Sequence, residues 1–162
     1  MRLVLLRHAT AIARGAPGFD DRDRPLTSDG ERESRLAGRA LKRSGVRPGA
    51  VISSPYERAR ATARIAAAEL RSDVVEDDRL EPGFGRADLD ALLAHHPASC
   101  LVLVGHDPDF SDLLHQISGV SCSMAKGGAA RVDVAVPMRP GQHELRWLLR
   151  PRQIALMAGE GA

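Results

Sequence analysis

The chain alternates between short apolar runs and longer segments in which apolar residues recur with helical spacing. Strand-like runs lie at residues 2–7, 50–53, 73–76 and 100–105. Helical spacing appears over residues 28–44, 54–70, 89–95 and 110–117. Such alternation predicts an α/β protein in which helices cover both faces of a mostly parallel sheet, a three-layer α/β/α sandwich.

Capping residues predict where two of these helices begin. Ser28 and Glu31 form a capping box for the first helix, and Gly45 follows its end. Ser54 is the expected N-cap of the second helix, with Pro55 at its first position. The apolar faces of the two helices predict core positions at Leu36, Ala37, Ala40, Leu41, Ala59, Ala63, Ala66, Ala67 and Leu70.

The last quarter of the chain has a different pattern. Two strand-like runs, 130–137 and 143–150, are joined by a short turn-forming segment, which predicts an antiparallel hairpin at one edge of the sheet. The tail after Arg152 carries no clear pattern. We expect residues 1–162 to form a single domain, since 43% of the residues are apolar and this length suits one core.

Charge and composition narrow the function classes. The 23 Lys and Arg residues nearly balance 21 Asp and Glu residues, so the net charge of +2 indicates neither a nucleic-acid nor a membrane partner. The basic residues are almost all arginines, which bind oxyanions with two parallel hydrogen bonds. Cys100 and Cys122 lack metal-ligand spacing. With no signal-peptide core and no membrane-length apolar stretch, we expect a cytoplasmic protein.

Chemically useful side chains follow three of the predicted strands. Arg7 and His8 end the first, Arg58 comes shortly after the second, and His106 follows the fourth. Parallel strands place their carboxyl ends at one edge of the sheet, where α/β proteins bind ligands. Two imidazoles, two guanidiniums and a helix N-terminus would then surround one pocket, which suits a phosphoryl group or a phosphate ion.

A metal site is the alternative use of the same strand ends. His8, His106, Asp107 and Asp109 are potential metal ligands. A cation there would lie beside the positive charges of Arg7 and Arg58, which disfavours binding. We therefore expect neither a metal nor another cofactor.

Four segments resemble, in order, the motifs of one family. They are LRHAT at 6–10, RPLTSDG at 24–30, SSPYERARATA at 53–63 and VLVGHDP at 102–108. Together they are similar to the histidine phosphatase superfamily, and within it to the small SixA-type phosphohistidine phosphatases. The resemblance covers nearly the whole chain. One departure is Ala9, which stands where the family has a glycine.

The resemblance, together with the strand-end residues, implies a metal-independent phosphatase mechanism. His8 would attack phosphorus and carry a phosphohistidine intermediate, while Arg7, Arg58 and His106 bind the phosphoryl oxygens. Glu81 is the first candidate for the general acid, because larger relatives have a glutamate in this stretch. Asp21 and Asp23 are the alternatives.

The expected substrate is a phosphohistidine on a protein, such as a phosphotransfer domain. Residues 77–99 hold only a loop and one short predicted helix, too little to form a lid over a small metabolite. Two other functions stay open. One is a small-molecule phosphatase or mutase of the same superfamily, and the other is a non-catalytic phosphate-binding module.

Overall fold

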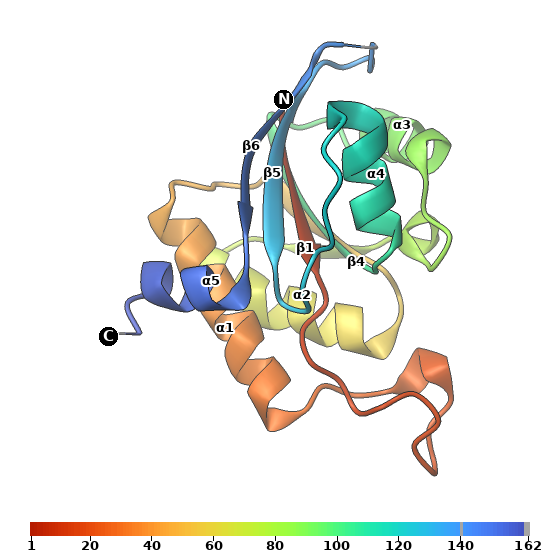
Figure 1. The fold of residues 1–162 in the computed structure, drawn as a ribbon, viewed down its shortest axis with the longest axis vertical. Helices are drawn as coiled ribbons and strands as arrows, with labels where there is room; N and C mark the ends of the chain where they lie inside the picture. Colours follow the sequence, from red (N-terminus) through yellow and green to blue (C-terminus); the bar gives the residue numbers. More distant parts are fainter. Residues whose placement is uncertain (140, 161–162) are drawn as a thin grey trace.

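The computed structural model describes residues 1–139 and 141–160, and its centre is one six-stranded sheet (Figure 1). The strands are β1 (Arg2–Arg7), β2 (Ala50–Ser53), β3 (Val74–Glu76), β4 (Cys100–Gly105), β5 (Ala129–Val134) and β6 (His143–Leu149). Their order across the sheet is β3-β2-β4-β1-β5-β6. The first four in this order run parallel, whereas β5 and β6 pair antiparallel. The predicted mostly parallel sheet with an antiparallel edge hairpin is confirmed.

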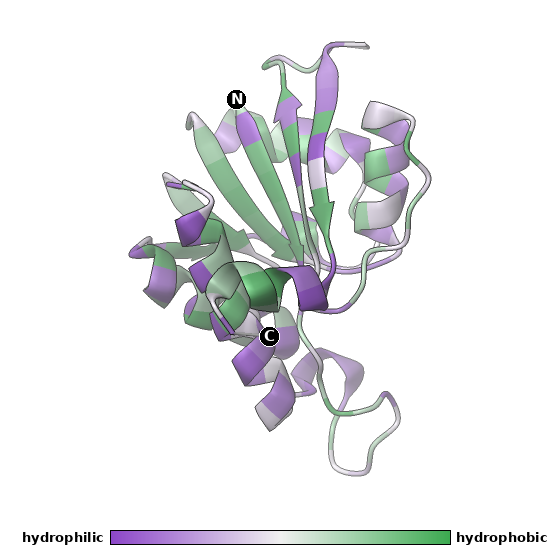
Figure 2. Ribbon diagram, turned by 60° about the vertical axis from the view of Figure 1, so that its left-hand side comes forward, coloured by the Kyte–Doolittle hydropathy of each residue, from purple (hydrophilic) through white to green (hydrophobic). Residues whose placement is uncertain are grey.

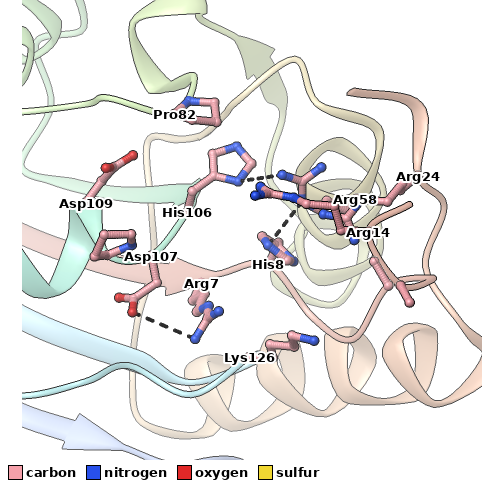
Figure 3. A pocket seen from close by; sticks show the side chains of 13 residues that line it. Arg7, His8, Arg14, Arg24, Arg58, Pro82, His106, Asp107, Asp109 and Lys126 are labelled. Carbon is pink, nitrogen blue, oxygen red and sulfur yellow. Dashed lines mark hydrogen bonds and ion pairs between the residues drawn. The ribbon is translucent and has the colours of Figure 1, made fainter. Parts of the chain in front are cut away.

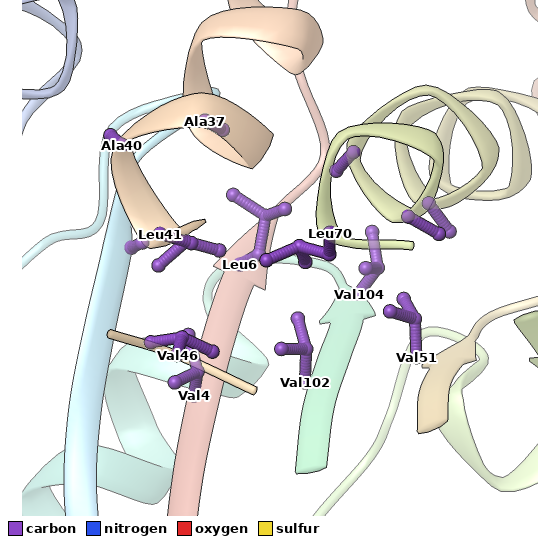
Figure 4. Close-up of a cluster of buried hydrophobic side chains, with 14 of the residues drawn as sticks. Val4, Leu6, Ala37, Ala40, Leu41, Val46, Val51, Leu70, Val102 and Val104 are labelled. Atoms are coloured by element: carbon purple, nitrogen blue, oxygen red, sulfur yellow. The ribbon is translucent and has the colours of Figure 1, made fainter. Parts of the chain in front are cut away.

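Helices cover both faces of this sheet. They are α1 (Ser28–Arg43), α2 (Glu57–Leu70), α3 (Arg86–His95), α4 (Asp109–Ser118) and α5 (Pro151–Ala158), with two 3-10 turns, η1 (Asp21–Asp23) and η2 (Asp78–Leu80). Val4 and Leu6 of β1 pack with α1, α2 and α5 (Figure 4), whereas Leu3 and Leu5 pack with α3 and α4. The central strands are therefore hydrophobic along their length (Figure 2), because both of their faces are buried.

The start of α2 differs from the prediction. The helix begins at Glu57, with Tyr56 as its N-cap, rather than at Pro55 after Ser54. Ser54 directly follows β2, and its backbone N–H is bonded to β4, because it donates to the carbonyl of Val104 at 2.9 Å. Its hydroxyl lies 2.8 Å from His106 Nε2 and accepts a hydrogen bond from the backbone N–H of Tyr56, which precedes the helix, rather than from an N–H within α2. Arg58 is consequently the second residue of α2.

Other helix ends differ by smaller amounts. The N-cap of α1 is Thr27, whose Oγ1 accepts a hydrogen bond from the Gly30 N–H, rather than Ser28. Helix α3 begins three residues before the predicted Leu89. The sequence pattern missed α5, which has Pro151 at its first position and buries only two side chains. So short a helix leaves too few apolar repeats to detect.

One sequence expectation, the cytoplasmic location, concerns the cell rather than the fold. Across residues 1–139 and 141–160, no helix has both the length and the apolar character needed to cross a membrane. The cytoplasmic location stays a prediction. Cys100 and Cys122 are both free thiols.

Candidate active site

The register of the sheet brings the strand ends together. Arg7 pairs with Gly105 across β1 and β4, so the residues that follow, His8 and His106, leave the sheet at the same level. Their ring centroids are 5.4 Å apart. Arg58 reaches both rings from the first turn of α2 (Figure 3). The structure thus places Arg7, His8, Arg58 and His106 around one pocket.

The His8 ring is held with a defined proton position. Its side chain is buried, with 6% exposure. The Nδ1 atom lies 2.8 Å from the carbonyl oxygen of Ala9, which can only accept, so Nδ1 carries the hydrogen. Nε2 accepts a hydrogen bond from the Nε of Arg58 at 3.2 Å. The Nε2 lone pair therefore faces the guanidinium of Arg58.

Burial keeps His8 uncharged. Desolvation, reinforced by the positive charges of Arg58 and Arg7 and by His106, lowers the pKa of His8 from 6.5 to about 3. At neutral pH the ring is a neutral imidazole with an available lone pair, as a nucleophile requires. Burial and the charge of Arg58 also lower the pKa of His106 to about 3.

Arg58 is fixed by the loop between β1 and α1. Its Nη1 donates to the backbone carbonyl of Asp21 at 2.6 Å, and its Nη2 lies 3.4 Å from the Asp21 carboxylate. Arg14 and Arg24 donate to the same carboxylate, each at 3.0 Å. Burial alone would raise the pKa of Asp21, but the three arginines lower it below its usual value. Asp21 is therefore ionised and orients Arg58.

Arg7 is fixed from the opposite side of the pocket. Its Nη1 donates to the carbonyl oxygen of Met124 and lies 3.8 Å from the Asp107 carboxylate. Its Nε is buried and has no hydrogen-bond acceptor within residues 1–139 and 141–160. This N–H is therefore an unpaired buried donor, in a residue that lines the pocket.

The pocket has a volume of about 330 Å³ and is strongly cationic. Its charged lining residues are Arg7, Arg14, Arg24, Arg58, Lys126, Asp107 and Asp109. Among the described residues, no three His, Cys, Asp or Glu side chains are grouped so that they could hold a metal ion. Five basic side chains around two neutral imidazoles have the charge and the donors that suit an oxyanion.

The three candidate general acids lie outside the pocket lining. Glu81 accepts a hydrogen bond from Arg22 at 2.8 Å, and only its neighbour Pro82 lines the pocket. Asp21 is bound to arginines, and Asp23 is exposed. In the structure none of the three carboxyl groups is placed among the lining residues, and the acid role of Glu81 stays a prediction.

Three of the pocket's basic residues, Arg14, Arg24 and Lys126, were not predicted from the sequence. Arg24 could have been predicted, because it is the first residue of the family-like motif RPLTSDG. Arg14 and Lys126 could not, since both lie in loops whose path depends on the whole fold. Ala9, in place of the family glycine, is fully buried, and its N–H donates to Thr62.

Comparison with known proteins agrees with this geometry. The sequence profile of the histidine phosphatase superfamily (branch 1) matches residues 3–88. An uncharacterized protein of Picosynechococcus sp. is 38% identical over 125 residues, which is 73% of each chain.

Two solved structures share the fold over almost the full length. The protein histidine phosphatase SixA complexed with tungstate is 25% identical, with a TM-score of 0.79 over 94% of this chain and 98% of that one. A putative phosphohistidine phosphatase SixA from Nakamurella multipartitia is 27% identical, with a TM-score of 0.79 over 93% and 95%. This chain therefore belongs to the histidine phosphatase superfamily and is of the SixA type.

Proposed function

We propose that this protein is a phosphohistidine phosphatase, which removes phosphoryl groups from histidine side chains of a partner protein. The proposal rests above all on one observation. The neutral, buried imidazole of His8 has its Nε2 lone pair turned toward Arg58 in a cationic pocket. In this proposal residues 1–162 act as one domain, without a metal or another cofactor.

The reaction has two displacements on phosphorus. In the first, His8 Nε2 forms a bond to phosphorus while the bond to the substrate's imidazole nitrogen breaks, and that nitrogen keeps the electron pair and gains a proton. In the second, water attacks the phosphorus, the bond to His8 breaks, and inorganic phosphate leaves.

Charge placement supplies most of the catalysis in this scheme. Arg7, Arg58 and His106 bind the equatorial oxygens, whose charge must be stabilised as the phosphoryl group moves. The phosphoryl oxygens take over the hydrogen bonds that Arg58 now makes to the two imidazoles.

The imidazole leaving group explains why the reaction can proceed although no candidate general acid lines the pocket. Imidazole leaves from phosphorus more readily than an alkoxide does, so a phosphohistidine needs less help from a positioned carboxylic acid. Glu81 remains our candidate for that help. It would have to leave its ion pair with Arg22 to reach the pocket beside Pro82.

The surroundings of the pocket favour a protein substrate. Between β3 and β4 the chain contains only η2 and α3, and Pro82 is the one residue of this connection that lines the pocket. Small-molecule sites enclose most of their ligand, whereas an uncovered pocket can accept a side chain that projects from another protein.

A panel assay tests this substrate choice. Phosphohistidine proteins, sugar phosphates and nucleotides are compared by kcat/KM, with His8→Asn as the control for contaminating phosphatases. We expect at least about tenfold higher kcat/KM for a phosphohistidine protein, which is about 1.4 kcal/mol of transition-state binding. Faster turnover of a metabolite would make the protein a small-molecule phosphatase. Phosphate binding without any turnover would make it a binding module.

A further inference from the structure

We propose that Glu33 of α1 is a positioning residue, which holds His8 in its reactive form through the peptide unit between Ala9 and Thr10. The two carboxylate oxygens of Glu33 are both bound to Thr10. Oε2 accepts from the backbone N–H at 2.9 Å, and Oε1 accepts from the hydroxyl at 3.0 Å. The role in catalysis rests on the function proposed above, whereas the hydrogen-bond chain itself does not.

A single peptide unit carries the contact from Glu33 to His8. The N–H of Thr10 and the carbonyl of Ala9 belong to the same trans peptide bond, which is planar, so they point in opposite directions. The N–H end is bound to Glu33, and the carbonyl end lies 2.8 Å from His8 Nδ1. Carboxylate, peptide and imidazole therefore form one continuous chain of hydrogen bonds.

A reversed peptide would move the hydrogen of His8 to the other ring nitrogen. The N–H of Thr10 would then face Nδ1, which would have to accept, and the one hydrogen of the neutral ring would lie on Nε2. Nε2 would keep no lone pair for phosphorus, nor for the hydrogen bond from Arg58. Glu33 opposes the reversal, because the Ala9 carbonyl would then point at carboxylate oxygens, which can only accept.

Other contacts fix the backbone on both sides of this peptide. The N–H of Ala9 donates to Oγ1 of Thr62 in α2 at 3.1 Å, and the carbonyl of Thr10 accepts from the N–H of Thr27 at 3.0 Å. Among the hydrogen bonds of the described residues, Glu33 is the one partner of the Thr10 N–H. The orientation of the peptide between these two anchors therefore depends on Glu33.

The chain can be measured in the wild-type protein without substrate. Long-range proton–nitrogen NMR spectra of histidine-labelled protein identify the tautomer of His8, and a His8→Gln sample assigns its signals. Hydrogen exchange then follows the Nδ1–H of His8 and the N–H of Thr10. We expect the Nδ1–H tautomer and protection of both hydrogens. An Nε2–H form, or a Thr10 N–H that exchanges as fast as in an unstructured peptide, would overturn the proposal, whether or not the protein proves to be a phosphatase.

Glu33→Ala separates positioning of His8 from a general effect on the pocket. The variant lacks both acceptors, so the Nδ1–H should exchange faster and kcat for an activated aryl phosphate should fall about tenfold to a hundredfold, as for a misplaced reacting group. Glu33 does not line the pocket, so the dissociation constant of inorganic phosphate should change by less than about threefold. Glu33→Met, which keeps the side-chain length without the acceptors, makes the same test if the alanine variant does not fold.

Glu33→Gln is the conservative variant and should rescue the site. Its amide oxygen can accept from the Thr10 N–H while its NH2 group donates to the Thr10 hydroxyl, so kcat should stay within about threefold of wild type. Glu31→Gln is the control, since Glu31 is an exposed acid on the same helix, and it should change neither spectrum nor kinetics. Wild-type exchange and kcat in folded Glu33→Ala, an equal loss of phosphate affinity and kcat, or failure of Glu33→Gln to rescue would each contradict the proposal.

Discussion

His8 and Arg58 show how single residues determine the chemistry of this site. The Ala9 carbonyl holds the hydrogen of His8 on Nδ1, and burial keeps the ring neutral, so Nε2 carries the free lone pair. Asp21 holds the outer end of the Arg58 guanidinium, which leaves its Nε for the pocket. The two side chains are therefore oriented before any substrate binds.

Arg58→Lys tests whether guanidinium geometry matters beyond its charge. A lysine keeps the positive charge but cannot contact Asp21, His8 and His106 with one planar group, so kcat/KM should fall by about tenfold to a thousandfold. Arg60→Lys is the matched control, because Arg60 lies on the same helix and pairs with Glu57 away from the pocket. Steady-state kinetics that show equal losses for the two variants would contradict this assignment.

Glu81→Gln tests the general acid. If Glu81 protonates the leaving group, the variant should slow an alkyl phosphate far more than an activated aryl phosphate, whose leaving group needs no proton. Glu69→Gln removes a similar surface ion pair, with Arg39, and should leave the ratio of the two rates unchanged. A uniform change on both substrates would exclude Glu81 from this role.

At the scale of elements, a strand or helix could be predicted from the sequence where a short stretch of residues determines it. The buried strands β1 and β4 are continuous apolar runs, so their positions and the meeting of Arg7, His8 and His106 at one sheet edge could be predicted. The Ser-Pro sequence before α2 predicted a cap, but Ser54 bonds to β4 through its backbone N–H and the helix begins three residues later. Contacts made only by the folded chain, such as that between Asp21 and Arg58, leave no local pattern.

Gly30→Ala tests the packing of α1 against the loop that follows His8. Alanine normally stabilises a helix relative to glycine, but a Cβ on Gly30 would lie 1.9 Å from the Thr10 carbonyl oxygen. The clash should dominate and lower the free energy of unfolding by about 2–3 kcal/mol in urea titrations. Gly85→Ala, where the nearest atom is 4.0 Å away, should stay within about 1 kcal/mol of wild type. Similar stabilities for the two variants would contradict the close contact.

At the scale of the whole molecule, the two buried histidines link stability to pH. Between pH 6.5 and about 3 the unfolded chain binds protons at His8 and His106 that the folded protein does not. The free energy of unfolding should therefore decrease as pH falls through this window, by up to about 1.4 kcal/mol per pH unit for each histidine.

Variants separate this effect from the titration of carboxylates. Urea titrations at several pH values should give a shallower dependence for His8→Gln than for wild type. His115→Gln, which replaces an exposed histidine of α4, should keep the wild-type slope. An unchanged slope for His8→Gln would show that His8 is protonated normally in the folded protein.

The central claim is that the Nε2 atom of His8 carries the phosphoryl group during turnover. Brief mixing with radiolabelled phosphoramidate, followed by alkaline quenching and peptide mapping, measures this directly. We predict an alkali-stable, acid-labile label on His8, at Nε2 rather than Nδ1, because Nδ1 is tied to the Ala9 carbonyl. His8→Asn should show no label and should lose at least about a thousandfold in rate, roughly 4 kcal/mol of activation free energy. Turnover without a label, a label on His106, or near wild-type activity in His8→Asn would contradict the account.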